Sequence, residues 1–249
     1  MEAFGLGIFM ISACVVTGLL EHPASPARRA IGDPVTRRVL IGLAMGLTAI
    51  CIIYSPWGKQ SGAHINPSVT LAFFRLGKIE PWDVFFYICA QFGGALAGVL
   101  ISAAALGNSI ADPSVNYAAT VPGPGGSGVA FLAELLISFG LMSVVLVATN
   151  TDRLSRFTGL FAGVLVAIYI SLEAPLSGMS MNPARTFGSA LPAQLWTALW
   201  VYLTAPLLGM LLAAEAYVRL KGARQVFCAK LDHYNDKRCI FRCGYQAGG

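Results

Sequence analysis

Six long apolar stretches with few charged residues run through this chain. They lie at residues 3–20, 39–55, 82–106, 130–150, 157–173 and 195–220. A helix needs about 17–25 apolar residues to cross a bilayer, whereas membrane β-strands alternate in hydropathy over about 10 residues. Only 12% of the residues are charged, against about 25% in soluble domains. The pattern predicts an all-α membrane protein with six transmembrane helices.

Two further apolar stretches, residues 65–76 and 181–191, are too short to span a membrane. A helix of ten residues is about 15 Å long, which is half of a hydrocarbon core about 30 Å thick. Such segments are surface loops or re-entrant half-helices, and half-helices are tolerated at membrane depth when protein surrounds them. We expect two re-entrant half-helices.

Two parts of the chain, residues 2–76 and 134–191, follow the same plan. Each starts with a glutamate, Glu2 or Glu134, at the head of an apolar span. A second span, a Ser-Gly step, an Asn-Pro pair and a short apolar run follow, and a third span closes each copy. Because three is an odd number, the second copy enters the membrane from the opposite side. The chain is therefore predicted to be an inverted-topology repeat.

The repeat also predicts the domain organisation. One channel domain covers residues 1–220, with repeat one over residues 1–106 and repeat two over residues 130–220. A basic, cysteine-containing tail follows over residues 221–249.

The Asn-Pro pairs, Asn66-Pro67 and Asn182-Pro183, are helix-start signals. Asparagine is a favourable N-cap, and proline suits the first helical position. The two half-helices would then face each other near the midplane with the positive ends of their dipoles. Each Asn oxygen would cap its own helix, leaving the NH2 group free to point into a lumen. Such a site offers donors to a passing oxygen atom and repels cations.

The residues before each asparagine cannot be helical if the cap is in place. Their carbonyl groups then need partners, and a file of pore solutes can supply them. The predicted pore backbone comprises Gly62, Ala63, His64, Ile65, Gly178, Ser180 and Met181. We interpret Glu2 and Glu134 as structural groups that hold this backbone through hydrogen bonds, and His64 as a histidine satisfied by nearby backbone. The alternatives are proton-coupling glutamates and a pH gate at His64.

These motifs resemble the paired Asn-Pro-Ala boxes of the aquaporin, or major intrinsic protein, family. The second box, Asn182-Pro183-Ala184, is complete and Arg185 follows it, whereas the first box, Asn66-Pro67-Ser68, has serine in place of alanine. The resemblance covers about residues 1–220. It implies the aquaporin-like fold, one pore per subunit and a homotetramer in a lipid bilayer, conducting water or other small uncharged solutes.

The resemblance also implies an outer selectivity filter of four residues. Counted from the boxes, these are Met45, Ile170, Met179 and Arg185. Water-selective members of the family typically have Phe, His, a small residue and Arg there, so three of the four positions differ. Thr186 and Ala190 resemble the residues that water channels have at these positions. Leu203 stands where water channels tend to have Trp.

The function predicted from these features is a passive water channel that excludes ions and protons. A facilitator of glycerol or another small uncharged solute is the first alternative. An ion-coupled secondary transporter is the second, and it would need a coupling carboxylate near the midplane. The spans contain no nucleotide-binding loop and no nucleophile with a base, so we expect neither an enzyme nor a cofactor.

The basic residues predict the orientation. Seven lysines and arginines lie within residues 219–242, directly after an apolar span. We interpret this run as a cytoplasmic tail obeying the positive-inside rule, not as a nucleic-acid-binding segment. Both termini of this multi-pass protein of the cell membrane would then be cytoplasmic. Arg28, Arg29, Arg37 and Arg38 would lie on the other side, against the rule.

The tail also contains Cys228, His233, Cys239 and Cys243. Three cysteines and one histidine can form a tetrahedral zinc site, but their spacing is loose and lacks a Cys-x2-Cys pair. We interpret them as reduced thiols and expect no metal; the alternative is a small tail that binds metal or senses redox state.

Overall fold

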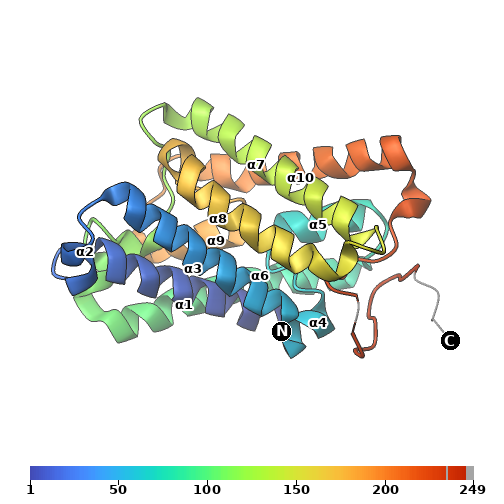
Figure 1. The fold of residues 1–249 in the computed structure, drawn as a ribbon, viewed down its shortest axis with the longest axis horizontal. Helices are drawn as coiled ribbons and strands as arrows, with labels where there is room; N and C mark the ends of the chain where they lie inside the picture. Colours follow the sequence, from blue (N-terminus) through green and yellow to red (C-terminus); the bar gives the residue numbers. More distant parts are fainter. Residues whose placement is uncertain (234, 245–249) are drawn as a thin grey trace.

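The computed structural model describes residues 1–233 and 235–244. Within this part, six helices are long and apolar enough to cross a membrane, and they lie side by side in one bundle (Figure 1). They are α1 (Glu2–Glu21), α3 (Pro34–Tyr54), α6 (Pro81–Leu106), α7 (Gly126–Thr149), α8 (Thr158–Ser177) and α10 (Leu199–Lys221). The prediction of an all-helical fold with six spans is confirmed.

The two short apolar stretches form helices α5 (Pro67–Arg75) and α9 (Pro183–Ala193) inside the bundle. At ~1.5 Å per residue they are roughly 14 and 17 Å long, which is half of a span. Helix α5 packs against α6 and α10, and α9 packs against the same two helices. The half-helix interpretation is therefore right and the surface-loop alternative is wrong.

Short helices make up most of the connections. They are α2 (Pro26–Ala30), α4 (Pro56–Ser61), η1 (Gly107–Ala111), η2 (Asn116–Ala118), η3 (Ser155–Phe157) and η4 (Ala223–Gln225). The N-terminus and the last described residues of the tail lie at the same end of the bundle (Figure 1). This arrangement agrees with an even number of spans.

Small residues let the long helices approach closely in three pairs, α1 with α6, α3 with α8 and α7 with α10. A Cβ atom added at Gly94 of α6 would collide with the carbonyl of Ala3, and one at Gly98 with the carbonyl of Gly7. In lipid, where no hydrophobic effect drives helices together, such close backbone contact is a main source of stability.

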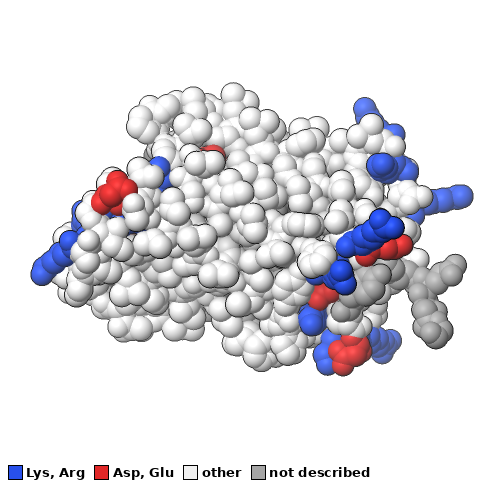
Figure 2. All heavy atoms as spheres, in the orientation of Figure 1, with Lys and Arg blue, Asp and Glu red and all other residues white. Residues whose placement is uncertain are grey.

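The outside of the bundle is apolar between two charged ends. Figure 2 shows lysines, arginines and carboxylates gathered toward the ends of the molecule, with a broad uncharged band between them. Leucines of several helices are exposed in the described structure, among them Leu47, Leu132, Leu172 and Leu212. A band of exposed large apolar side chains on this scale suits contact with lipid tails.

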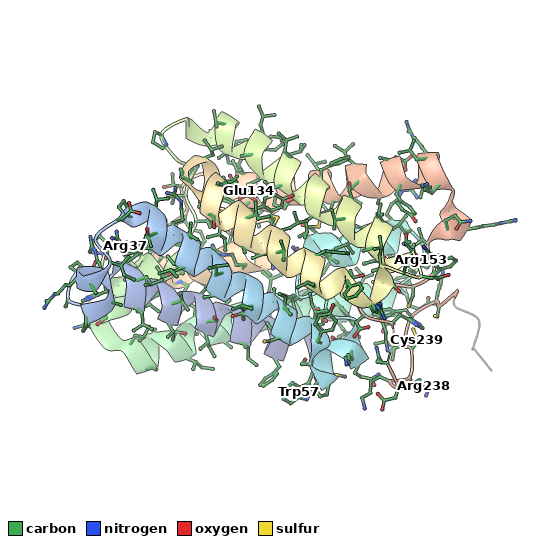
Figure 3. All side chains as sticks on the ribbon, in the orientation of Figure 1. Arg37, Trp57, Glu134, Arg153, Arg238 and Cys239 are labelled. Carbon is green, nitrogen blue, oxygen red and sulfur yellow. The ribbon has the colours of Figure 1, made fainter. Side chains whose placement is uncertain are left out.

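Arginines at the end opposite the termini have structural partners. Arg37 is 7% exposed, pairs with Glu21 at 3.2 Å, and donates to the carbonyls of Ile31 and Gly32 at 2.9 Å. Arg38 donates to the carbonyl of Ser171 at 2.9 Å. Figure 3 places Arg37 at this end. These contacts give Arg37 and Arg38 a structural role at this end of the bundle.

The tail folds back onto the end of the bundle that holds the termini. Helix α10 ends at Lys221, and beyond it the backbone N–H of Leu231 donates to the carbonyl of Gly62 at 3.2 Å. Arg242 forms an ion pair with Glu80. The predicted tail, residues 221–249, includes residues 234 and 245–249, which lie outside the described residues.

Candidate pore

Both half-helices begin at their Asn-Pro pairs. Asn66 is the N-cap of α5, and its side-chain oxygen accepts the N–H of Ser68 at 2.8 Å. Asn182 is the N-cap of α9, and its oxygen accepts the N–H groups of Ala184 at 3.1 Å and Arg185 at 3.2 Å. The capping predicted from the sequence is therefore present in both repeats.

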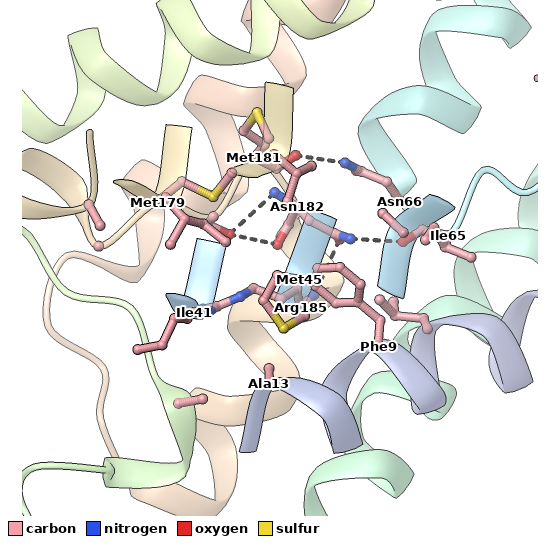
Figure 4. A pocket seen from close by; sticks show the side chains of 18 of the residues that line it. Phe9, Ala13, Ile41, Met45, Ile65, Asn66, Met179, Met181, Asn182 and Arg185 are labelled. Atoms are coloured by element: carbon pink, nitrogen blue, oxygen red, sulfur yellow. Dashed lines mark hydrogen bonds between the residues drawn. The ribbon is translucent and has the colours of Figure 1, made fainter. Parts of the chain in front are cut away.

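Contrary to expectation, the amide NH2 group of each asparagine donates a hydrogen bond within the protein. Asn66 Nδ2 donates to the carbonyl of Met181 at 2.7 Å, and Asn182 Nδ2 donates to the carbonyl of Ile65 at 2.8 Å (Figure 4). The two bonds cross between the repeats and tie the half-helices together. Since an amide NH2 has two hydrogens, each asparagine keeps one donor for a solute.

The two loops before the caps share an unusual backbone. The φ angle is positive at Gly62, Ala63 and Ile65 in the first loop, and at the matching residues Gly178, Met179 and Met181 in the second. Ile65 has φ of 42°, which is a strained value for a β-branched residue. Such strain persists only where the surroundings over-determine the conformation.

Glu2 supplies the restraint in the first loop. Its carboxylate accepts from the backbone N–H groups of His64 at 3.2 Å and Ile65 at 2.6 Å. It also accepts from the Ser61 hydroxyl at 2.7 Å and from Gln91 Nε2 at 2.8 Å. These four hydrogen bonds fix the loop in the conformation that presents Asn66.

Glu134 does the same in the second loop. Its carboxylate accepts from the Ser177 hydroxyl and from the N–H groups of Ser180 and Met181, each at 2.7 Å. One expectation was wrong, because Glu134 does not stand at the head of a span. Helix α7 begins at Gly126, so Glu134 lies about two turns inside it.

His64 is fully paired in the structure. Its ring is 2% exposed, with Nε2 at 2.8 Å from the carbonyl of Ala229 and Nδ1 at 3.1 Å from the hydroxyl of Thr70. A carbonyl can only accept, so Nε2 carries a proton. The expected backbone partner exists, but it comes from the tail and not from the loop around His64.

A cavity of about 380 Å³ runs past both asparagines. Arg38 and Pro113 line it near the end opposite the termini, and Leu231 lines it near the tail. The predicted residues on its wall are Met45, Ala63, His64, Ile65, Asn66, Ile170, Gly178, Met179, Ser180, Met181, Asn182 and Arg185. The other predicted site residues are not among those that line it: Glu2, Gly62, Pro67, Ser68, Glu134, Pro183 and Ala184.

Arg185 is the polar member of the predicted filter. Met45, Ile170 and Met179 share the cavity wall with it, and Figure 4 shows Met45 beside it. Its Nη1 atom is buried and has no hydrogen-bond partner among the described residues. The residue as a whole is only partly buried and lines the cavity, so other N–H groups of its guanidinium can donate to a solute oxygen there.

Sequence reasoning missed several residues on the cavity wall. Ile41 lies beside Arg185 in Figure 4 and lines the cavity. It precedes Met45 by four residues and so shares its helix face, a signal that was readable in the sequence. Leu231 had no such signal, because it lies in a polar tail far from both boxes.

The serine that departs from the family motif does not face the pore. Ser68 is completely buried, and its hydroxyl oxygen has no hydrogen-bond partner among the described residues. The substitution therefore changes the packing of α5 and not the polarity of the cavity.

A second cluster of polar side chains lies in the tail. One ligand atom from each of Cys228, His233, Cys239 and Cys243 lies within 4.8 Å of the others. The structure thus brings together the four residues that form only a weak metal candidate in the sequence.

Comparisons with known proteins agree on one family. A family model described as major intrinsic protein matches residues 2–217. The chain is 42% identical over 216 residues to Aquaporin NIP6-1 of Arabidopsis thaliana, covering 86% of this chain and 66% of that protein. It is 36% identical over 216 residues to Aquaporin NIP2-1 of Zea mays, covering 85% and 70% respectively. The chain thus spans about two thirds of the length of these relatives.

The fold has a match among solved structures. The X-ray structure of the aquaglyceroporin from Plasmodium falciparum superposes with a TM-score of 0.70, covering 87% of this chain and 92% of the other. Only 19% of the aligned residues are identical, so this similarity is one of fold.

Proposed function

The chain belongs to the major intrinsic protein family of membrane channels, and we propose that it is a passive channel for water that excludes ions and protons. The observation that carries this proposal is the pair of capped half-helices. Asn66 and Asn182 meet in the wall of one cavity, each with one amide hydrogen left to donate. The family consists of channels and not of enzymes.

The physical basis for excluding cations is the direction of the half-helices. Helices α5 and α9 begin at Asn66 and Asn182, so the positive ends of both dipoles lie beside the cavity. Positive half-helix ends and an arginine oppose the passage of protons and metal ions in aquaporin-type pores generally. Arg185 would add the second barrier here. Water, which can accept from the asparagines and from Arg185, is not opposed.

A facilitator of glycerol or a similar uncharged solute is the second candidate. The observation that favours it is the apolar character of the predicted filter, where Met45, Ile170 and Met179 accompany Arg185. Apolar side chains offer water no hydrogen bonds but can pack against the carbon atoms of a polyol. Methionine is also flexible, so it adapts to solutes of different shape.

Stopped-flow light scattering, which follows the volume of proteoliposomes, distinguishes the two candidates. Vesicles containing the protein are exposed to a sucrose gradient, which measures water flux, and to a glycerol gradient, which measures glycerol flux. A water channel accelerates only the first response, whereas a facilitator accelerates both. Volume changes no faster than in protein-free vesicles, under both gradients, would refute the channel proposal.

An ion-coupled transporter is not supported by the buried carboxylates at the pore. Glu2 and Glu134 accept hydrogen bonds from loop backbone, so both already have a structural role. Glu173 is also buried, but it is not among the residues that line the cavity. Solute flux that depends on a proton or sodium gradient would revive this alternative.

We also propose a homotetramer in the cell membrane, with residues 1–220 forming the channel and both termini in the cytoplasm. The apolar outer band supports the membrane setting. The basic residues at the end with the termini, such as Arg153 and Arg238 in Figure 3, support the orientation. Native mass spectrometry in detergent tests the assembly, and a monomer as the largest species would count against it.

A further inference from the structure

The cluster in the tail has the composition and size of a metal site. Cys228 Sγ lies 3.4 Å from Cys239 Sγ, and His233 Nε2 lies 3.0 Å from Cys243 Sγ. In a tetrahedral zinc site with Zn–S near 2.3 Å and Zn–N near 2.0 Å, ligand atoms lie roughly 3.5–3.8 Å apart. Shifts of less than about 1 Å would therefore let all four atoms surround one ion.

The tail backbone folds so that these four residues converge. Lys230 is only 2% exposed, and its ammonium group donates to the carbonyls of Lys237 at 3.0 Å and Arg238 at 3.4 Å. These bonds bring the stretch after Cys228 against the stretch before Cys239. The loop is thus closed by buried polar contacts that are independent of the thiols.

Charge also favours a thiolate-bound ion at this place. Three thiolates and a neutral imidazole around Zn²⁺ carry a net charge of about −1. A buried charge is costly unless it is paired. Lys230, a buried cation two residues from Cys228, can supply the opposite charge.

A disulfide is the other chemistry that two nearby thiols allow. Cys228 and Cys239 are not disulfide-bonded in the structure. A bond between them would leave His233 and Cys243 without a shared role, although their side chains converge on the same point. Three cysteines and one histidine in a closed set are instead one of the usual ligand sets of structural zinc.

We propose that the tail binds one zinc ion through Cys228, His233, Cys239 and Cys243, and that the ion holds the tail at the mouth of the pore. The proposed ligands flank Leu231 and Phe241, two tail residues that contact the channel.

Leu231, between Cys228 and His233, lines the cavity and bonds to the carbonyl of Gly62. Phe241, between Cys239 and Cys243, stacks on His64 with ring centres 5.5 Å apart. One ion would therefore fix these two contacts, in addition to the bond between His64 and the carbonyl of Ala229, on the loop that precedes Asn66.

Zinc content tests the site directly. The full-length protein is purified without chelators, and its zinc is measured by elemental mass spectrometry. We expect about one zinc ion per chain, and less than about a tenth of that in Cys228→Ser and Cys239→Ser. Cys51→Ser and Cys89→Ser, which change exposed cysteines of the spanning helices, should keep the full content.

A further variant distinguishes loss of a zinc ligand from loss of zinc through misfolding. His233→Cys is expected to retain the ion, because four thiolates also bind zinc tetrahedrally. Replacing zinc by Co²⁺ in the wild type should give the absorption of a tetrahedral cobalt-thiolate centre. Wild-type protein without zinc that takes up none from a zinc-buffered solution would overturn the proposal, and so would full zinc content in Cys228→Ser.

Limited trypsin digestion tests the anchoring of the tail. Arg238 is exposed and lies between two of the proposed ligands. Removing zinc with a chelator should accelerate cleavage there by about tenfold, because release of the ion frees the loop. Cleavage at Arg153, an exposed residue of another loop, serves as the control and should not change. Equal cleavage of Arg238 with and without chelator would refute the anchoring.

Discussion

Single residues account for the chemical character of the pore. Arg185 has a buried donor without a partner in the described structure, and Asn66 and Asn182 each retain one amide hydrogen. The rest of the predicted filter is apolar. Selectivity would then depend on a few hydrogen-bond donors, so single substitutions should have large and specific effects.

The first prediction concerns Arg185. Replacing it by valine removes a charge-assisted hydrogen bond to the solute, worth about 1.5–3 kcal/mol, together with a barrier to cations. We expect Arg185→Val to raise glycerol and cation permeability relative to water by about tenfold or more. Proteoliposome flux assays measure both ratios, with Arg153→Val as the control for loss of a positive charge. Unchanged ratios would show that Arg185 is not in the filter.

The second prediction concerns Ser68. Its hydroxyl is buried without a partner in the described structure, and an unsatisfied buried polar group costs about 1–3 kcal/mol. Ser68→Ala should therefore leave water flux unchanged and raise the thermal unfolding temperature in detergent. Ser68→Val is the matched comparison, because it adds volume at a fully buried position. A lower unfolding temperature for Ser68→Ala would mean that the hydroxyl contributes stability.

At the scale of elements, each loop before a half-helix depends on one glutamate from a spanning helix. Glu2 of α1 holds the first loop and Glu134 of α7 holds the second. The positive φ angles at Ile65 and Met181 show what these carboxylates restrain. The loops are neither helix nor strand, so their backbone N–H groups lack regular partners. The buried carboxylates accept hydrogen bonds from these N–H groups instead.

The third prediction removes one of these restraints. Glu134→Ala leaves the N–H groups of Ser180 and Met181 without their acceptor, at about 1–3 kcal/mol each. We expect a lower unfolding temperature and loss of most water flux, because Asn182 is no longer held in place. Glu215→Ala, which removes a partly exposed carboxylate of α10, should have little effect on either measurement. Wild-type flux in Glu134→Ala would contradict the structural role of this residue.

At the scale of the whole molecule, the pore is built between the repeats. Half-helix α5 of the first repeat packs on α10 of the second, and α9 of the second packs on α6 of the first. The crossed bonds of Asn66 and Asn182 join the same two halves. Neither repeat could form the cavity alone, so the pore needs both repeats.

The fourth prediction concerns the orientation of the molecule in the membrane. Asn108, in η1 after α6, and Arg153, in the connection after α7, are both exposed, and one spanning helix, α7, lies between them. With both termini in the cytoplasm, a membrane-impermeant maleimide should label Asn108→Cys in intact cells. Arg153→Cys should be labelled only after permeabilisation. The reverse pattern would place the termini outside.

Much of this architecture was readable from the sequence, for identifiable reasons. The lengths of the apolar stretches determine which helices can span, since a bilayer has a definite thickness. Asn66-Pro67 and Asn182-Pro183 determine where the half-helices begin, because capping and the fixed φ of proline are local properties. The odd number of spans in each copy determines that the repeat is inverted.

Other features depended on which distant groups meet, and only the tertiary structure decided them. The amides of Asn66 and Asn182 bond across the repeats instead of staying free. His64 finds its acceptor in the tail. Leu231 reaches the pore, and the tail cysteines gather around His233 despite their loose spacing. Hydrogen bonds and ligand sets of this kind depend on distances in space, which the spacing of residues along the chain does not determine.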